Sequence, residues 1–354
     1  MDRDTVDVYE HRASEWTARR RPARVEEARG LARRTGPGAV RADLGSGPGF
    51  VTGALGAPVV ALDAAGTMLG LVRRRAPSAW CVQGDLEALP FRDRSLGAAW
   101  AQASYLHVPR AGLPRALAQL HRACAPGAPF LLVLRSGRGE GRRRDDDFPG
   151  RFFARWEAGP LTDVLVGAGF AVEALRVEDE WIVAEATRAR SLPDTVGPGM
   201  RLLVCGLNPS LSAADAGVGF AGRSNRFWPA AVAAGLVPRD RDPFAALAAG
   251  VGMTDLVKRA TPGAAELRTQ EYREGAGRVE RLVRWLRPRA SCVVGLAGWR
   301  AAVDRHARPG PQPLPFGGRP VYLMPSTSGL NARSRPEDLV GHLRAAAALA
   351  ASAG

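Results

Sequence analysis

Short apolar runs alternate with amphipathic segments along the first half of the chain. Residues 112–124 carry apolar positions at helical spacing. Apolar runs of strand length occupy residues 39–44, 58–62, 80–83, 96–101 and 129–134. Strands that alternate with helices are typical of a parallel sheet covered on both faces. The pattern therefore predicts an α/β fold for the first half.

The second half repeats this alternation with fewer strands. Apolar strands are predicted at residues 202–205, 291–294 and 321–324, and each ends in a turn that contains glycine or proline. Ligands bind at such strand ends in open α/β sheets. The helix predicted at 272–286 has a basic face formed by Arg278, Arg281 and Arg284. A three-layer α/β fold follows, with its turns along one edge.

Several segments between these runs carry weaker patterns. We expect helices at residues 152–156 and 161–169, and an antiparallel pair of strands within 171–186. Thr254-Asp255 has the composition of a helix start. Proline and glycine in residues 191–199 predict a linker. The expected domains are therefore residues 1–190 and 200–354.

A glycine-rich loop follows the first strand, in the run Asp43-Leu-Gly-Ser-Gly-Pro-Gly49. Gly45 and Gly47 would let the backbone approach a nucleotide-like ligand closely. Asp63 ends the second strand, about 20 positions on, where a carboxylate can bind ribose hydroxyls. A dinucleotide site for NAD is one alternative, but Gly84-Asp85-Leu86 and Leu89-Pro-Phe after the third strand speak against it.

The order of these motifs over residues 8–188 resembles class I S-adenosylmethionine-dependent methyltransferases of the type 11 kind, which have a Rossmann-like fold. The resemblance implies S-adenosyl-L-methionine as the cofactor. It places Asp43, Gly45 and Gly47 at the methionine end, Asp63 at the ribose, and Asp85 with Leu86 at the adenine.

The methyl acceptor is unknown from the sequence. After the fourth strand, residues 102–107 lack both the Asn/Asp-Pro-Pro-aromatic motif and the Pro-Cys nucleophile of DNA-base methyltransferases. We therefore expect a small molecule or an RNA wobble base rather than a DNA base. His107 is either a general base near the transferred methyl group or a structural contact.

A second candidate site lies where the strand at 202–205 ends. Gly206 lets the backbone leave the strand, Pro209 prevents its continuation, and Asn208 lies between them at the strand's carboxyl end. Gly206-Leu-Asn-Pro-Ser with Gly219-Phe-Ala and Asn225-Arg-Phe-Trp, then Gly252–Arg259, and then Met324–Asn331 form three blocks in this order. Over residues 200–350 they resemble the mismatch-specific uracil/thymine DNA glycosylases, members of the uracil-DNA glycosylase superfamily with a three-layer α/β/α fold.

The resemblance implies cleavage of an N-glycosidic bond after the target base is flipped out of the duplex. Asn208 would orient the attacking water, while Phe220 would stack on the base and backbone N–H groups of Leu207 and Phe220 would bind its carbonyls. Gly329 and Leu330 would form the wedge that fills the vacated stack. Phosphate contacts are implied for Arg333, with Ser210, Ser326 and Lys258 as further candidates.

Simpler roles remain open for the same residues. Asn208 is also a residue type that caps its own turn, and Leu330 could fold onto the core. Ser326-Thr327 stands where the family has Asn-Pro, and Leu296 and Trp299 stand where it often has Lys and an aromatic residue.

Charge agrees with a polyanionic partner for the second half. The net charge is +14; residues 1–200 carry 28 basic and 24 acidic side chains, whereas residues 201–354 carry 21 and 11. A basic excess in one half suits nucleic-acid binding. The alternative is that the arginine excess reflects the base composition of the coding sequence, because Lys258 is the only lysine and all the other Lys and Arg positions are arginine.

Other properties narrow the class of protein. No apolar run reaches the roughly 18 residues that a membrane span needs, and the N-terminus lacks a signal-peptide pattern. The four cysteines are scattered, without metal-ligand spacing. We expect a cytoplasmic monomer without a metal.

These observations predict a bifunctional fusion. The first half would methylate an unknown acceptor, and the second would excise uracil, thymine or a modified cytosine from mismatched double-stranded DNA. One rival is a methyltransferase for tRNA or a small molecule whose second half only supplies nucleic-acid affinity. The other is a non-catalytic reader of DNA damage, which would bind mismatched duplex tightly and in a salt-sensitive way.

Overall fold

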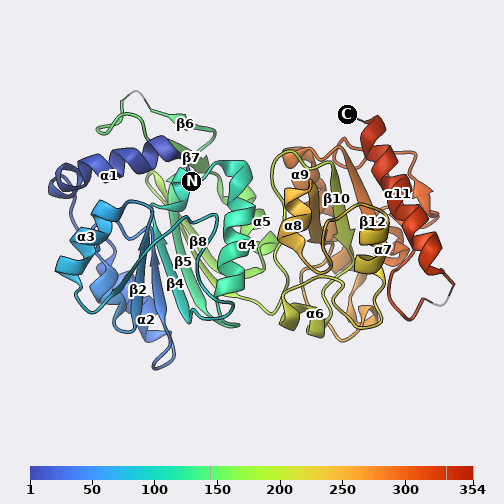
Figure 1. Cartoon of the computed structure of the whole chain (residues 1–354), viewed down its shortest axis with the longest axis horizontal. Coiled ribbons are helices and arrows are strands. Elements are labelled where there is room, and N and C mark those ends of the chain that lie inside the picture. Colours follow the sequence, from blue (N-terminus) through green and yellow to red (C-terminus); the bar gives the residue numbers. More distant parts are fainter. Residues whose placement is uncertain (144, 332, 354) are drawn as a thin grey trace. The chain divides into compact units, whose positions relative to one another are not determined.

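The computed structural model describes residues 1–143, 145–331 and 333–353. The chain divides into two compact units, shown with their elements in Figure 1. The first unit contains Met1–Val166 and Phe170–Ala189, and the second contains Gly167–Gly169 and Arg190–Gly354. Each unit is built around its own sheet.

The sheet of the first unit is mostly parallel. Its strands are β1 (Arg41–Leu44), β2 (Val59–Asp63), β3 (Trp80–Gln83), β4 (Ala98–Gln102), β5 (Pro129–Ser136), β6 (Glu140–Arg142), β7 (Phe152–Trp156), β8 (Phe170–Glu178) and β9 (Trp181–Arg188). The order is β3-β2-β1-β4-β5-β7-β6, and β9 pairs with β5 and β8. Neighbouring strands from β3 to β5 are parallel, whereas β9 runs antiparallel to both of its partners. The predicted pair of closing strands is therefore present.

Helices cover both faces of this sheet (Figure 1). They are α1 (Arg3–Ala18), α2 (Val25–Arg33), α3 (Gly66–Arg75), α4 (Leu113–Ala123) and α5 (Ala158–Gly167), with short 3₁₀ segments η1 (Thr52–Leu55), η2 (Tyr105–His107) and η3 (Arg110–Gly112). Val59 packs with α2 and Ala61 with α3. Side chains two apart on a strand point to the same face, so α2 and α3 share one face of the sheet.

The second unit has a smaller sheet, ordered β11-β10-β12-β14-β13. Its strands are β10 (Leu202–Gly206), β11 (Val251–Asp255), β12 (Ala290–Val294), β13 (Gly310–Pro311) and β14 (Val321–Met324). All are parallel except the edge strand β13. The carboxyl ends of β10, β11, β12 and β14 consequently meet at one edge.

Two layers of helix enclose this second sheet (Figure 1). The helices are α6 (Leu211–Ala216), α7 (Phe227–Ala233), α8 (Pro243–Ala248), α9 (Thr269–Leu286), α10 (Leu296–Ala302) and α11 (Pro336–Ser352), with the 3₁₀ segment η4 (Ala264–Glu266). Residues of α7 and α11 share one buried apolar cluster with the strands, and α9 and α11 lie on opposite faces of the sheet. Both halves are therefore α/β folds, as the alternating pattern predicts.

Two predictions of secondary structure were wrong. Residues 152–156 form strand β7, paired with β5 at Arg135 and Arg155, rather than a helix. Thr254 and Asp255 end strand β11 in register with Cys205 and Gly206, rather than starting a helix. Residues 152–156 pair with β5 and β6, and Thr254 and Asp255 pair with β10. Local composition does not report such pairing.

The segment predicted as a linker is packed into the second unit. Asp194, Thr195 and Val196 are buried, and the Thr195 backbone exchanges two hydrogen bonds of 2.9 Å with Met253 of β11. This segment therefore packs against β11, and residues 191–199 are part of the folded unit.

The predicted basic face of α9 also needs correction. Arg278 is buried, and its guanidinium donates to the Asp194 carboxylate at 2.6 Å and to the backbone oxygen of Asp255 at 2.8 Å. Lys258 donates to the same carboxylate at 2.9 Å. Arg278 and Lys258 therefore neutralise a buried carboxylate and are not available to bind phosphate.

Within the described residues, no helix is long and apolar enough to cross a bilayer, and no group of three acidic, histidine or cysteine side chains could hold a metal ion.

Candidate functional site

A cavity of about 280 Å³ opens at the carboxyl ends of β1, β2 and β4. Five of the predicted cofactor residues line it: Asp43, Gly45, Gly47, Asp63 and Leu86. Aromatic residues that the motifs did not reveal complete the lining, among them Tyr9, Trp16, Phe50, Trp100 and Trp181. Tyr9 and Trp16 come from α1, a helix whose sequence carries no motif.

Gly45 occupies a position that only glycine can fill. Its φ is +71°, and an added Cβ would lie 2.2 Å from the Ser104 Cβ, which follows β4. Gly47 also has a positive φ, of +52°, and its N–H donates to the Asp63 carboxylate at 2.8 Å. The glycine-rich turn is thus pressed against the end of β4 and tied to the end of β2.

Both carboxylates of the cleft resist ionisation because they are withdrawn from solvent. Burial raises the pKa of Asp43 to about 7, although a 2.6 Å hydrogen bond from Thr52 opposes the shift. Burial likewise raises the pKa of Asp63 to about 6, against hydrogen bonds from the backbone N–H groups of Ala65 and Gly47. A bound cation or hydroxyl donor would therefore stabilise the ionised forms.

Asp85 is the one predicted cofactor residue that does not line the cavity. Its carboxylate accepts hydrogen bonds of 2.9 Å from the Glu87 N–H and from the amino group of Met1. Its neighbour Leu86 is buried and does face the cleft. The contact of Asp85 with an adenine amino group stays a prediction.

His107 lines the cavity with both ring nitrogens already bonded. Nδ1 lies 2.6 Å from the Phe152 carbonyl oxygen, which can only accept, so Nδ1 carries the proton. Nε2 then accepts from the Tyr9 hydroxyl at 2.9 Å, and Arg151 donates to that hydroxyl at 3.0 Å. Burial lowers the pKa of His107 to about 4. The geometry favours the structural role over the general base.

In the second unit, the side chain of Asn208 is held by three acceptors. Its Nδ2 donates to the backbone oxygens of Pro209 at 3.0 Å and Arg259 at 3.1 Å, and to Thr261 Oγ1 at 2.8 Å. Thr261 gives its own proton to the Gly263 carbonyl. Since carbonyl oxygens only accept, the amide nitrogen must face them. Among the described residues, the Asn208 Oδ1 receives no hydrogen bond, so this oxygen is left to accept one from a ligand or water.

Phe220 lies beside the same strand end. One face of its ring stacks on Phe227, with centroids 4.3 Å apart and planes 24° from parallel. Its backbone has φ 58°, unusual for a bulky residue, and the preceding Gly219 carbonyl is held by Trp228 Nε1 at 2.8 Å. The half-buried ring is thus fixed in place with its edge near Gly206, where an added Cβ would lie 3.2 Å from Phe220 Cζ.

The loop formed by residues 326–331, here termed the wedge loop, presents Leu330 to solvent. This side chain is 96% exposed, the most of any large apolar residue described. Gly329 allows the loop to lie against a second loop, because an added Cβ would come within 2.5 Å of the Ser224 Cβ. Leu330 therefore does not fold onto the core.

The wedge loop is held by residues whose role the motifs did not reveal. Arg226 donates to the backbone oxygens of Ser334 at 2.6 Å, Asn331 at 2.7 Å and Ser328 at 3.2 Å. Asn225 Oδ1 accepts from the buried Thr327 hydroxyl at 2.9 Å. The sequence block that contains Asn225 and Arg226 marked these residues as candidates for the site. It did not indicate that they brace a loop about 100 residues away.

Of the remaining predicted residues, Arg333 has an exposed side chain, whereas Ser210 and Leu207 already make hydrogen bonds within the protein. Arg333 is exposed, with its backbone N–H donating to Asn331 Oδ1. The Ser210 hydroxyl caps α6 by accepting from the Ala213 N–H at 3.1 Å. The Leu207 carbonyl accepts from the Val257 N–H at 2.9 Å, which ties the strand-end loops of β10 and β11 together.

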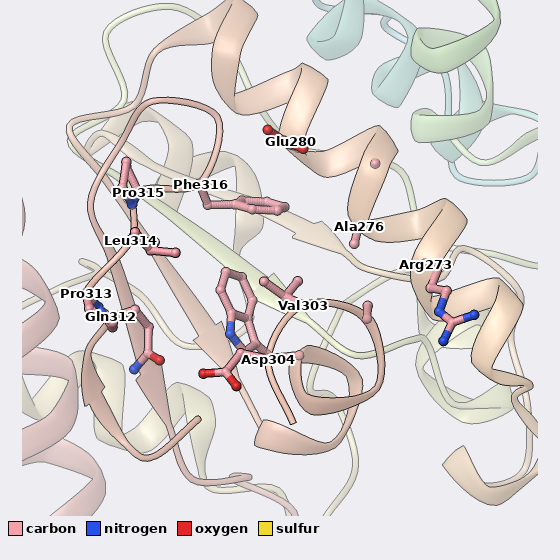
Figure 2. A pocket seen from close by; sticks show the side chains of 13 residues that line it. Arg273, Ala276, Glu280, Val303, Asp304, Gln312, Pro313, Leu314, Pro315 and Phe316 are labelled. Carbon is pink, nitrogen blue, oxygen red and sulfur yellow. The ribbon is translucent and has the colours of Figure 1, made fainter. Parts of the chain in front are cut away.

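A larger cavity of about 680 Å³ lies in the second unit away from these residues (Figure 2). Arg273 and Glu280 of α9 flank one side, Val303 and Asp304 after α10 another, and residues 312–316 close the third. No predicted site residue lines it. The volume of a cavity therefore does not by itself identify the edge of the sheet where Asn208 and Phe220 lie.

Two family models match the chain. Residues 42–132 match a model described as a methyltransferase domain, and residues 193–346 match the uracil DNA glycosylase superfamily. The first match covers the glycine-rich turn and the second covers Asn208, Phe220 and the wedge loop. The chain therefore joins a methyltransferase domain of Rossmann-like fold to a domain of the uracil DNA glycosylase superfamily, as the motifs indicated.

Solved structures similar to the chain include methyltransferases. A SAM-dependent methyltransferase from Methanosarcina mazei is 18% identical over 45% of this chain and 96% of its own, with a TM-score of 0.41. The 1,6-didemethyltoxoflavin-N1-methyltransferase of Burkholderia thailandensis is 22% identical over 52% and 86%, with a TM-score of 0.43. A TehB-like SAM-dependent methyltransferase from Corynebacterium glutamicum is 22% identical over 53% and 100%, with a TM-score of 0.41.

S-adenosylmethionine is the cofactor that the sequence motifs imply for this methyltransferase domain, and the cleft has groups that fit it. Trp16 Nε1, Trp100 Nε1 and Ser104 Oγ belong to residues that line the cavity and have no partner among the described atoms. Asp43 and Asp63 would hold the cofactor's amino and ribose hydroxyl groups. Once bound, it supplies an activated methyl group to a nucleophile that the cleft positions and desolvates.

Proposed function

We propose that the second unit hydrolyses the N-glycosidic bond of uracil in G·U mismatched DNA, with thymine and modified cytosines as slower substrates. The observation that carries this proposal is the fixed amide of Asn208. Its nitrogen donates to three acceptors, and its oxygen receives no hydrogen bond from the described residues, so the oxygen is left to accept one. A water that donates one proton to this oxygen has its own lone pair free to attack.

The reaction balances without a strong base. The bond between C1′ and the base nitrogen N1 breaks, and its electron pair stays on the base. The cationic sugar that results accepts the water oxygen at C1′, and one water proton then leaves to solvent. The base anion takes up a proton on release. Because an amide cannot remove a proton near neutral pH, the enzyme should be slow and should depend on how well the base leaves.

The surface around Asn208 agrees with a duplex substrate. One face of the half-buried Phe220 ring stacks on Phe227, and we expect the other face to stack on an extruded base, a mode of reading flipped bases. Leu330 stands fully exposed on a braced loop, and inserted apolar side chains fill the space that such a base vacates. Arg333 is exposed three positions beyond Leu330, where it could contact a phosphate backbone.

The test is single-turnover release of uracil from a G·U duplex by the full chain and by Asn208→Ala. We expect the substitution to slow excision on the order of 100-fold or more, because the water loses its positioning. Gln270→Ala removes an exposed amide from α9 and should leave the rate unchanged.

Two outcomes would overturn the proposal. Excision by Asn208→Ala at the wild-type rate would remove the catalytic role of this residue. Tight, salt-sensitive binding of the mismatched duplex by the wild-type chain without release of any base would instead identify a non-catalytic reader.

A further inference from the structure

The cavity of about 680 Å³ in Figure 2 takes no part in the excision proposed above. Its walls are α9, the end of α10 and residues 309–316, here termed the proline strap. Two of the six large apolar side chains exposed among the described residues line it: Leu314, which is 76% exposed, and Val303, which is 47% exposed. Exposed apolar groups gathered in a concave surface are typical of a site that binds a partner.

The proline strap is braced before any ligand binds. Proline occupies alternate positions in it, at 309, 311, 313 and 315, and the proline ring fixes the backbone φ. Where the strap ends, Phe316 and Arg319 exchange backbone hydrogen bonds of 2.9 and 3.2 Å. Gly317 then lets the turn lie against α9, since an added Cβ would come within 2.7 Å of the Glu280 carbonyl oxygen. A partner would therefore bind with little cost for ordering this wall.

Two polar groups of the cavity are held by the protein and still have capacity for a hydrogen bond. Trp299 is only 4% exposed, and its Nε1–H makes no hydrogen bond with the described residues. Gln312 Nε2 donates to the Arg308 and Gly310 carbonyl oxygens, each at 2.9 Å. Because carbonyl oxygens only accept, the amide nitrogen must face them, and Gln312 Oε1 receives no hydrogen bond from the described residues. The cavity thus offers one fixed donor and one fixed acceptor.

The charges around the cavity disfavour a nucleic-acid strand. Glu280 and Asp304 bring carboxylates to its lining, and Arg273 brings the one guanidinium. Glu280 is paired with Arg284 at 2.7 Å, whereas the Arg273 guanidinium has no partner among the described residues. A phosphate backbone requires an excess of positive charge, which this lining lacks. A single acidic side chain, in contrast, can pair with Arg273.

An extended peptide matches the unpaired groups. Each of its residues presents one backbone C=O and one N–H, which Trp299 Nε1–H and Gln312 Oε1 can bind respectively. A helix would use these backbone groups internally, so it would leave the indole and the amide oxygen unmatched. Alternate side chains of an extended segment point to one side, where they can enter the apolar part of the cavity.

We propose that this cavity binds an extended segment of a partner protein, which inserts an apolar side chain between Leu314 and Val303 and pairs an acidic side chain with Arg273. Figure 2 shows the proline strap on one side of the cavity and Arg273 on the other, so the two contacts lie at different ends of the segment. The inference does not depend on uracil excision. It gives the second unit a docking site that shares no residue with the Asn208 edge.

The experiment selects a phage-displayed library of random dodecapeptides on the immobilised full chain. The enriched sequence is then made as a fluorescein-labelled peptide, and its binding is measured by fluorescence anisotropy. We expect enriched sequences to combine an apolar residue with a nearby aspartate or glutamate. Uracil release by each variant described below should equal that of the wild type.

The variants test each contact separately. Leu314→Ser should weaken binding at least about tenfold, because an apolar contact is lost, whereas Val232→Ser changes an exposed apolar residue of α7 and should have no effect. Arg273→Glu should weaken binding at least about tenfold by placing two like charges together. Arg289→Glu reverses an exposed charge outside the cavity and should not. Trp299→Phe keeps an aromatic ring and removes the N–H, so it should weaken binding about threefold to tenfold.

Three outcomes would overturn the inference. The selection could enrich no shared sequence. The enriched peptide could bind Leu314→Ser and Arg273→Glu as tightly as the wild type, which would place it elsewhere on the chain. Displacement of the bound peptide by single-stranded oligothymidylate would instead identify the cavity as a nucleic-acid site.

Discussion

The cofactor cleft of the first unit and the Asn208 edge of the second are both built at the carboxyl ends of parallel strands. In the cleft, Asp63 already accepts from two backbone N–H groups and Asp43 from Thr52. A cavity of defined volume surrounds them. At the Asn208 edge, the amide oxygen, the Asp255 carboxyl group and the Leu330 side chain have no partner within the described chain.

This difference follows from the size of what each site binds. A small cofactor can be enclosed, so the two carboxylates of its cleft are held in advance by the protein itself, while Trp16 Nε1, Trp100 Nε1 and Ser104 Oγ have no partner among the described atoms. A duplex cannot be enclosed, and the base enters only after it leaves the stack. If the second unit binds a duplex as proposed, its site consists of braced loops with unsatisfied groups, which the substrate would complete.

The largest expected effect concerns the bracing of the Asn208 edge. Arg278→Ala removes one partner of the buried Asp194 carboxylate, and breaking such a pair costs about 3–5 kcal/mol. We expect the second unit to lose this much stability in denaturant unfolding. Arg284→Ala on the same helix removes only an exposed pair with Glu280 and should cost less than about 1 kcal/mol. Equal losses would show that Arg278 belongs to a solvated basic face after all.

The next effect tests the free-energy cost of burying the Asp43 carboxyl group in the cofactor cleft. Asp43 has a pKa of about 7 in the folded chain and about 3.9 when unfolded. The unfolded chain therefore releases its proton first, so the carboxyl group destabilises the fold increasingly from about pH 4 to 7 and constantly above that. Asp43→Asn removes a cost on the order of 4 kcal/mol.

Calorimetry of the full chain without cofactor should show a higher Tm for Asp43→Asn at pH 8, and a smaller gain at pH 5. Titration with S-adenosylmethionine should show about tenfold or more weaker binding, since a hydrogen bond to a charged group is lost. Asp7→Asn, at an exposed position of α1, should change neither. A lower Tm at pH 8 would mean that Asp43 stabilises the empty cleft.

The smallest effect probes the wedge loop. Leu330→Ala should weaken binding of a G·U duplex about tenfold, because the apolar side chain is buried only in the complex. Binding is best measured by fluorescence anisotropy in an Asn208→Ala background, which prevents turnover. Leu314→Ala removes a leucine that is 76% exposed in the cavity of Figure 2 and should have no effect. If the two substitutions weaken binding equally, the wedge loop does not enter the duplex.

The sequence by itself determined the two α/β halves, the glycine turn at Gly45 and the place of Asn208 at a strand end. Strand and helix periodicities and the need for glycine at a tight turn are local properties, so they can be read along the chain. The tertiary structure alone decided which way the Asn208 amide faces, since its acceptors Arg259 and Thr261 lie 51 and 53 residues away. It also buried Arg278, packed residues 191–199 against the second sheet and brought Asp255 to the Asn208 edge. Burial and pairing depend on which distant segments meet. The same arginine or aspartate side chain is solvated when it lies on the surface, but it is paired or protonated when another segment covers it.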